Sequence, residues 1–366
     1  MMSRRKYLGL MGSAPLMAQA PAAAPAAPEL DWHEAKKFTV EGQGFKDVKS
    51  VYDRLPLRAE ATVRPEVWGL SRNSAGILVR FMADTRAIHA RWTVTGKNLA
   101  GVNITAVASS GLDLYAKTDA GKWRWLGIGK PTKFPDNTDA LAEGLIPGYR
   151  EYMLYLPLRN NVTALEIGIS KDAKITPGPQ RLPGAKPIVF YGTSITHGIS
   201  ASRAGMTHVA ILGRMMNREV INLGFSGNGK MEPEVTKFVA EIDAEAYVLD
   251  CLPNMNAKEV TERAENCVNT LRGAHAKTPI LLVEDRNYGN GFLVESRKKH
   301  NDDNHDALRA VYAKMQKVKF PGLFYLKADH LVGLDGEGLI DGSHPTDLGF
   351  MRQAIEFQKV LAKMLK

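Results

Sequence analysis

The sequence predicts an α/β fold, a doubly wound parallel sheet, preceded by an antiparallel β-sandwich. Residues 31–175 contain short β-rich runs and no long amphipathic helix, whereas residues 185–366 alternate apolar strands with helical patterns. Between them, residues 176–184 hold three prolines and two glycines, which neither a helix interior nor a central strand accommodates. We therefore expect a domain boundary in this segment; the alternative is a long surface loop within one domain.

In the first part, six runs either alternate apolar and polar residues or are continuously apolar, as strands do. Two of them flank Thr118-Asp119-Ala120-Gly121, which has the composition of a hairpin turn. The absence of an intervening helix pattern makes an antiparallel sandwich the simplest arrangement. The runs cover residues 76–82, 87–94, 111–116, 122–126, 152–156 and 164–169.

In the second part, each apolar strand is followed by a helical pattern. This alternation is typical of a parallel sheet with helices on both faces, and such sheets place their sites at the carboxyl ends of the strands. The expected strands are 186–191, 220–223, 246–249, 280–283 and 323–326, and the expected helices are 206–216, 232–240, 257–274, 303–318 and 346–365.

The first 20 residues have the pattern of a twin-arginine-type export signal. Arg4 and Arg5 precede a short apolar stretch, and Ala18-Gln19-Ala20 forms a small-x-small cleavage site. Residues 21–30 are an Ala/Pro-rich linker. We expect a periplasmic or secreted protein with no integral membrane segment after processing, because no stretch reaches spanning length. A disordered basic N-terminus is the alternative.

Composition and charge narrow the function classes. The chain has 366 residues, is 44% hydrophobic and 24% charged, and carries a net charge of +9, which suits an ordinary globular protein with sizeable cores. No long Lys/Arg run or basic patch interleaved with aromatic residues occurs, so we expect no nucleic-acid partner. Two cysteines, Cys251 and Cys267, are too few for a disulfide framework or zinc site. The two cysteines could be buried free thiols, or they could form a single disulfide bridge.

Chemically specific residues follow the expected strands of the second part. Ser194 lies in a tight turn between the first strand and a helix, where a serine nucleophile and free backbone N–H groups can meet. A glycine-rich loop, residues 222–229, follows the second strand, and Asn254 follows the third. Asp341 stands three residues before His344, a spacing that lets a carboxylate bond Nδ1–H and leave Nε2 free as a base. Taken singly, each residue could also serve as a turn or cap.

The order of these elements resembles the SGNH/GDSL hydrolase family, whose blocks carry Ser, Gly, Asn and His in that order. Gly192-Thr193-Ser194-Ile195 resembles the first block, with Thr and Ile in place of Asp and Leu, and Phe225-Ser226-Gly227-Asn228 resembles the second. Asn254 takes the third position, although Leu252 and Met255 replace the usual Gly and Asp around it. Gly111-Leu112-Asp113-Leu114-Tyr115 resembles the Gly-x-Asp-Leu-Tyr signature of a β domain that precedes some members.

The resemblance implies a flavodoxin-like hydrolase domain and a serine esterase that needs no metal or cofactor. It implies Ser194 as nucleophile, His344 as base and Asp341 as orienting acid. The N–H groups of Ser194 and Gly227 and the amide of Asn254 would form the oxyanion hole. We expect a small-molecule or carbohydrate ester as substrate, with acetyl as the acyl group. His197, His208 and Arg286 are candidate substrate-binding residues.

Two other functions share the same residues. An acyltransferase would use the same acyl-enzyme and pass the acyl group to an alcohol. A catalytically inactive glycan-binding protein is disfavoured, because the set of Ser194, His344 and Asp341 is intact.

Overall fold

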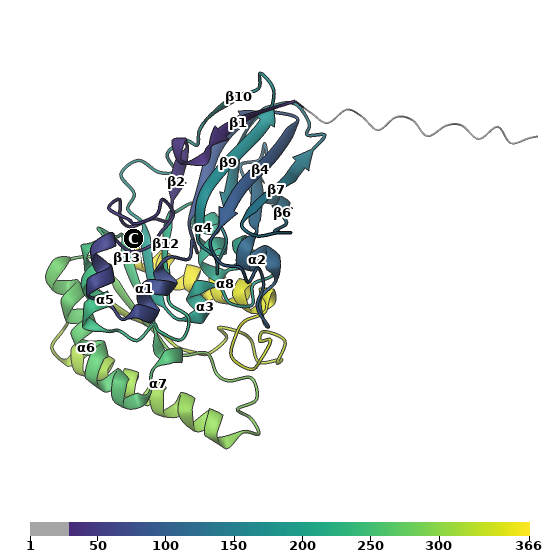
Figure 1. Cartoon of the computed structure of the whole chain (residues 1–366). Helices are drawn as coiled ribbons and strands as arrows, with labels where there is room; N and C mark the ends of the chain where they lie inside the picture. The colour runs from purple at the N-terminus through teal and green to yellow at the C-terminus, as the bar shows by residue number, and fades with distance from the viewer. Residues whose placement is uncertain (1–28) are drawn as a thin grey trace, which may run out of the picture.

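The computed structural model describes residues 29–366. It contains a β-sandwich of two sheets that packs against an α/β half (Figure 1). The predicted export signal, residues 1–20, and almost all of the predicted linker lie outside the described residues. Within residues 29–366, no helix has both the length and the apolar character needed to cross a membrane.

The first 150 described residues form two antiparallel sheets. In the four-stranded sheet, β9 pairs with β1 and β4, and β4 pairs with β7. In the six-stranded sheet, β2 and β10 together cover one edge of β3, and β8, β5 and β6 follow on its other side. The four-stranded sheet comprises β1 (Leu30–Glu34), β9 (Val162–Ser170), β4 (Ala87–Val94) and β7 (Asp136–Glu143). The other comprises β2 (Thr39–Glu41), β10 (Lys174–Pro177), β3 (Leu78–Asp84), β8 (Tyr149–Tyr155), β5 (Leu112–Lys117) and β6 (Trp123–Gly129).

Alternating side chains from the two sheets meet in one core. Along β4, Ile88, Ala90 and Trp92 are buried, while the residues between them are more exposed. From the other sheet, Phe81 and Tyr152 stack with their rings 5.3 Å apart within the same cluster. The antiparallel sandwich expected from the sequence is therefore confirmed.

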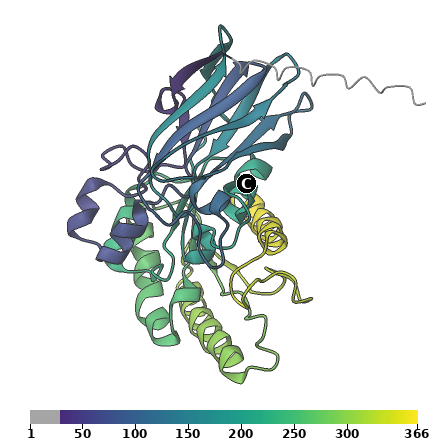
Figure 2. The same cartoon turned by 45° about the vertical axis from the view of Figure 1, so that its right-hand side comes forward.

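The C-terminal half is a five-stranded parallel sheet with the order β12-β11-β13-β14-β15. Its core lies on two faces: α4 and α8 pack against one face, whereas α5, α6 and α7 pack against the other (Figures 1 and 2). This confirms the doubly wound fold. The strands are β11 (Ile188–Gly192), β12 (Val220–Gly224), β13 (Ala246–Asp250), β14 (Ile280–Val283) and β15 (Leu323–Leu326). The helices are α4 (His208–Met216), α5 (Pro233–Glu241), α6 (Ala257–Ala274), α7 (Glu295–Lys317) and α8 (Asp347–Met364).

Several elements differ from the sequence expectations. Strands β1, β2, β7 and β10 and two short helices, α1 (Pro65–Ser71) and α2 (Ala106–Ser110), were not expected. Helix α7 begins at Glu295, eight residues before its expected start. Its first turns are polar, and ion pairs such as Lys298–Asp302 and Lys299–Asp303 occupy their surface, so they lack the apolar periodicity that marks a helix.

The two halves share cores across their contact. Met153 and Tyr155 of the six-stranded sheet pack in one cluster with Ile195, next to the nucleophile candidate, and with Phe350 of α8. Arg54 reaches into the α/β half and donates to the backbone oxygens of Asn222 (3.0 Å) and Gly224 (2.8 Å). The domain boundary at residues 176–184 stays a prediction, because the two halves pack as one continuous body.

The two cysteines are buried free thiols in the structure, which is one of the two alternatives left open by the sequence. Burial is the main cause that raises the pKa of Cys267 to about 12, although the Thr236 hydroxyl, 3.4 Å from its sulfur, works in the other direction. Both thiols therefore act as small apolar side chains.

Candidate active site

Ser194 is the first residue of a four-residue helix, α3 (Ser194–His197), that begins where β11 ends. The Thr193 hydroxyl caps this helix by accepting the Ile195 N–H at 3.3 Å, and Gly198, at φ +104°, ends it. The turn is so tight that a side chain at Gly192 would come within 2.1 Å of the Thr196 hydroxyl. The N–H of Ser194 belongs to the first helical turn, which has no carbonyl partner inside the helix.

His344 bridges Ser194 and Asp341. Its Nε2 lies 2.9 Å from Ser194 Oγ, and its Nδ1 lies 2.7 Å from Asp341 Oδ2. The other carboxylate oxygen of Asp341 accepts the backbone N–H groups of His344 (2.8 Å) and Ser343 (3.1 Å). The structure thus brings Ser194 to the Asp341–His344 pair, although Ser194 and His344 lie 150 positions apart in the sequence.

The charge on Asp341 favours one tautomer of His344. Partial burial would raise the pKa of Asp341, but the hydrogen bonds from the backbone and ring of His344 and from Ser343 lower it to about 2. The carboxylate is therefore ionised near neutral pH and accepts the proton on Nδ1. Nε2 is left unprotonated, facing the Ser194 hydroxyl.

Asp347, the other carboxylate three residues from His344, contacts a different part of the chain. Its side chain accepts the backbone N–H of Ser202 at 2.9 Å and also the Ser202 hydroxyl. It is the first residue of α8, where a carboxylate meets the positive end of the helix dipole. Its role in the structure is to tie the loop after α3 to the start of α8.

Gly227 and Asn254 lie at the same edge of the sheet as Ser194. The strands that precede them, β12 and β13, flank β11 in register, with Gly192 opposite both Gly224 and Asp250. Gly227 has φ +72° in a turn closed by the Asn228 N–H and the Phe225 carbonyl at 2.8 Å, a conformation that favours glycine.

The side chain of Asn254 is oriented by the same loop. Its Oδ1 accepts the Gly229 N–H at 3.2 Å, so the amide nitrogen, with its two donors, points away from this contact. Gly229 in turn packs against the end of β11, since a side chain there would come within 2.0 Å of the Gly192 carbonyl. Loop and asparagine are therefore held against the strand that carries Ser194.

The three residues expected to contact substrate are buried, and this expectation is corrected. His197 and His208 are fully buried and Arg286 is 2% exposed. His197 Nε2 lies 2.6 Å from the Leu158 carbonyl, and His208 stacks against Phe350 and Phe357. Burial, reinforced by nearby arginines, holds the pKa of both histidines well below the usual value. None of these side chains is open to a substrate.

Arg286 instead belongs to a buried polar network beneath the nucleophile turn. Its guanidinium pairs with Asp250 and donates to Gln353 at 2.7 Å. Asp250 also accepts the Thr196 hydroxyl of α3 at 2.9 Å. Since each buried charge has its partners, the network fixes α3 against β13. This network was not predictable from sequence patterns, because its members are far apart along the chain.

The β-sandwich also contributes to the site, which the sequence did not predict. Asn103 Nδ2 donates at 3.1 Å to Asp341 Oδ2, the same oxygen that lies 2.7 Å from His344 Nδ1. From the Gly-x-Asp-Leu-Tyr segment, Asp113 accepts the guanidinium of Arg203 (2.9 Å) and the Gly205 N–H (2.8 Å). The Tyr115 hydroxyl contacts the same guanidinium. This signature therefore holds the loop that follows α3.

Comparison with known proteins identifies the family. A model of the GDSL-like lipase/acylhydrolase family matches residues 185–362, and a model of the N-terminus of SGNH-hydrolase-type esterases matches residues 30–175. A crystal structure of a candidate GDSL-like lipase from Bacteroides ovatus is 36% identical, covers 92% of this chain and 98% of its own, and has a TM-score of 0.87. The chain belongs to the GDSL-like lipase/acylhydrolase family. It is therefore a carboxylic ester hydrolase of the SGNH/GDSL type.

More distant structures share the architecture of this SGNH/GDSL esterase. A salicylyl-acyltransferase from a tetracycline biosynthetic pathway has a TM-score of 0.73 at 16% identity, covering 92% of this chain and 97% of its own. A family two carbohydrate esterase from Clostridium thermocellum has a TM-score of 0.55 at 14% identity, covering 80% and 93%. These likenesses concern the fold. No curated protein matches the chain in sequence.

Proposed function

We propose that this esterase is exported and removes small acyl groups, acetyl above all, from carbohydrates through a Ser194-His344-Asp341 triad. The observation that carries the proposal is the position of the His344 ring, 2.9 Å from the serine hydroxyl and 2.7 Å from the aspartate. In acyl transfer, the first contact lets Nε2 accept the serine proton, and the second lets the aspartate accept a hydrogen bond from Nδ1–H.

In the proposed mechanism, His344 Nε2 takes the Ser194 proton as Oγ bonds to the ester carbonyl carbon. The tetrahedral intermediate collapses, the carbon–alcohol oxygen bond breaks, and the alcohol leaves with the proton from Nε2. Water then gives a proton to Nε2 and attacks the acyl-enzyme, which releases the acid and returns the proton to Ser194. Asp341 stabilises the imidazolium at each step without accepting its proton.

The oxyanion would be held by three donors: the N–H groups of Ser194 and Gly227 and the Asn254 amide. Support for this assignment comes from the ends of β11, β12 and β13, which are adjacent in the sheet. It also comes from the contact that turns Asn254 Oδ1 toward Gly229 and leaves its amide nitrogen available. Donors held in place before reaction stabilise the developing charge without reorganisation.

The carbohydrate part of the proposal is supported by structures that share this two-part architecture. Several are named as family two carbohydrate esterases. Another is named as an acetyl xylan esterase from Butyrivibrio proteoclasticus, with a TM-score of 0.56 at 9% identity over 92% of this chain. Export is supported by the twin-arginine pattern around Arg4 and Arg5.

The decisive experiment compares wild-type protein with Ser194→Ala on p-nitrophenyl esters of increasing chain length and on acetylated xylo-oligosaccharides. We expect Ser194→Ala to lose hydrolysis of every ester, and a fluorophosphonate to label wild type at Ser194 alone. Ser296→Ala, on the surface of α7, is the matched control and should keep full activity. Hydrolysis by Ser194→Ala, or labelling of another serine, would refute the triad.

Two further readouts address substrate and reaction type. Rates that rise with acyl length and no acetate release from the oligosaccharides would refute the carbohydrate assignment. Addition of an alcohol acceptor tests transfer: formation of its ester faster than release of free acid would make the protein an acyltransferase, with the same acyl-enzyme.

A further inference from the structure

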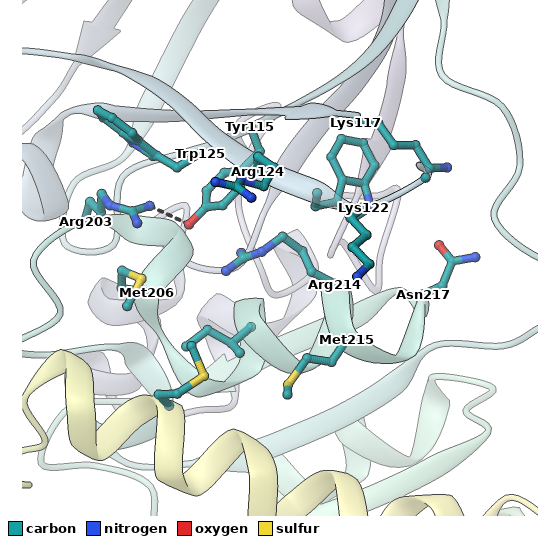
Figure 3. A pocket seen from close by; sticks show the side chains of 14 residues that line it. Tyr115, Lys117, Lys122, Arg124, Trp125, Arg203, Met206, Arg214, Met215 and Asn217 are labelled. Carbon is teal, nitrogen blue, oxygen red and sulfur yellow. Dashed lines mark hydrogen bonds between the residues drawn. The ribbon is translucent and has the colours of Figure 1, made fainter. Parts of the chain in front are cut away.

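A pocket lies outside the triad, where the β5–β6 hairpin of the sandwich faces the loop after α3 and helices α4 and α8 (Figure 3). Its volume is about 720 Å³. Along the hairpin, Tyr115 pairs with Trp125 and Lys117 with Trp123 in register, so these four side chains share the sheet face that looks toward the α/β half. Met206 and Met215 line the pocket on the side of the α/β half (Figure 3). Met351 of α8 also lines it.

The pocket is strongly basic. Five of its lining side chains are cationic and none is acidic; the cations are Lys117, Lys122, Arg124, Arg203 and Arg214. Two of them have carboxylate partners nearby: Arg203 pairs with buried Asp113 and Lys117 with buried Glu151, both at 2.9 Å. Within residues 29–366, the other three form no salt bridge with a carboxylate.

Among the cations of the pocket, Arg214 has the guanidinium best placed to bind an anionic ligand. Its guanidinium is half-buried, lies 4.1 Å from the Tyr115 ring centroid, and donates only to the Tyr155 hydroxyl (3.0 Å) and the Gly205 carbonyl (2.8 Å) among described residues. A guanidinium has five donors in a planar fork that matches a carboxylate. The carboxylate whose charge acts on Arg214, Asp113, already pairs with Arg203. An anion that binds in the pocket would give this half-buried cation a partner of its own.

The aromatic side chains indicate what carries the anion. Trp125 is 51% exposed, although exposing an indole to water is unfavourable, and Trp123 lies two residues before it on the same face. Flat aromatic faces bury the C–H face of a sugar ring, and neighbouring cations bind carboxylates on that ring. Two indoles spaced along one strand suit consecutive sugars of a chain.

We propose that this pocket is a non-catalytic binding site for a carboxylated sugar chain. It lies close to the triad along the chain: Met351 follows His344 by seven residues, which limits the separation of their Cα atoms to about 25 Å. A polymer held there can present an ester to Ser194. The consequence for substrate choice rests on the proposed function, whereas binding in the pocket does not.

The test uses the full-length Ser194→Ala protein, so that no ester is consumed, and isothermal titration calorimetry. The probe is a hexameric oligogalacturonate, and the matched ligand is the same hexamer with its carboxylates methyl-esterified. We expect the charged hexamer to bind about tenfold more tightly, because hydrogen bonds to charged groups are the stronger ones. Equal affinity for the two hexamers, or no binding of either, would overturn the proposal.

Variants locate the site. Lys122→Ala combined with Arg124→Ala, both on the exposed hairpin, should weaken binding of the charged hexamer about tenfold. Trp125→Ala should weaken binding of both hexamers, because stacking does not depend on charge. The control pair, Lys237→Ala with Lys258→Ala, removes two exposed cations from α5 and α6 on the opposite face of the parallel sheet. It should leave affinity within about twofold.

Three outcomes separate this inference from its alternatives and from the proposed function. Tighter binding of a single-stranded oligonucleotide than of oligogalacturonate, with the same response to the pocket variants, would reassign the pocket to nucleic acid. Failure of every hexamer to bind, while wild-type protein still hydrolyses p-nitrophenyl acetate through Ser194, would overturn the pocket assignment alone. Binding in the pocket without any Ser194-dependent hydrolysis would overturn the proposed function alone.

Discussion

At the scale of single residues, two carboxylates compete for one histidine in the sequence, and the structure separates them. Asp341 contacts the His344 ring, while Asp347 contacts Ser202. The difference arises from the turn between Asp341 and His344, where Gly342 takes φ +85° and lets the aspartate fold back on the imidazole. Asp347 follows Pro345 and Thr346 into α8 and faces away from the ring.

These positions predict opposite effects for two conservative changes. Asp341→Asn removes the negative charge that holds the Nδ1–H tautomer, and we expect kcat to fall by up to about 10⁴ with little change in stability. Asp347→Asn weakens a helix-dipole interaction, and we expect it to lower the free energy of unfolding by about 0.3–1 kcal/mol with kcat nearly unchanged. Steady-state kinetics and urea unfolding on both variants measure this, and an exchange of the two effects would show that Asp347 is the orienting acid.

Asn254 provides a second residue-scale prediction. If its amide is an oxyanion donor, Asn254→Ala should lower kcat by about 10²–10³ and change KM much less, because the interaction forms only in the transition state. Asn256→Ala, at the N-cap of α6, is a suitable control, since it should cost stability and leave kcat intact. An unchanged kcat in Asn254→Ala would reduce Asn254 to a support for the Gly229 loop.

At the scale of elements, the sequence predicted helices and strands best where their apolar pattern is strong. The strands β11 to β15 were expected within about two residues at each end, because each is a continuous apolar run between polar loops. The first turns of α7 were missed because their surface is almost entirely charged. Strand β7, Asp136–Glu143, was missed because its first four residues are polar and Leu141 is its only large apolar residue, so its pairing with β4 is what identifies it.

The same contrast holds for the site. Ser194, His344 and Asp341 were predictable because each sits in a short segment with a recognisable order. Asn103, Arg203 and the Asp250–Arg286 pair were not, because their contacts join residues that are distant in sequence, as in the 238-residue separation of Asn103 from Asp341. His197 and Arg286 show the reverse error: residues with catalytic chemistry in the right segments serve to fix α3.

The segment after β14 makes stability depend on pH. Burial, together with the charge of Asp250, raises the pKa of Asp285 to about 7, although Arg286 acts in the opposite direction. The unfolded chain releases this proton near pH 4. Folding therefore retains a proton between about pH 4 and 7, so the stabilisation is complete below pH 4 and is lost as the pH rises toward 7.

Asp285→Asn should remove this dependence, because an amide does not titrate. We expect the thermal midpoint of the variant to gain on that of wild type as the pH is raised from 4 to 8, measured by circular dichroism. Asp119→Asn is the control, since the side chain of Asp119 is 95% exposed. A constant difference between Asp285→Asn and wild type across this range would show that Asp285 is ionised in the folded protein.

At the scale of the whole molecule, the sandwich and the α/β half depend on each other. Phe45, Leu55 and Val67 from the N-terminal half are buried in the same cluster as Val189 and Phe225. Removing the N-terminal half would expose this apolar surface and take away Arg54 and Asn103, which contact the ends of β12 and the triad candidate Asp341. The α/β half is therefore incomplete without its sandwich.

We expect a chain that begins at residue 184 to be aggregated or to lack a cooperative thermal transition, and to lose hydrolysis of p-nitrophenyl acetate. A chain that begins at residue 29 serves as the control and should unfold cooperatively. Light scattering and calorimetry distinguish the outcomes. A soluble, active chain from residue 184 would show that the shared core contributes little to the folding of the α/β half.

The shared core also has a consequence during synthesis on the ribosome. Tyr155 and Leu158 of this cluster are made early, whereas Phe350 and Ala354 of α8, which complete the same buried cluster, are made almost two hundred residues later. At about 5–20 residues per second, the cluster waits roughly 10–40 s for its last members. Until α8 has been translated, the apolar surface that Phe350 and Ala354 bury in the finished fold is left uncovered, at a stage when exposed apolar surface favours aggregation.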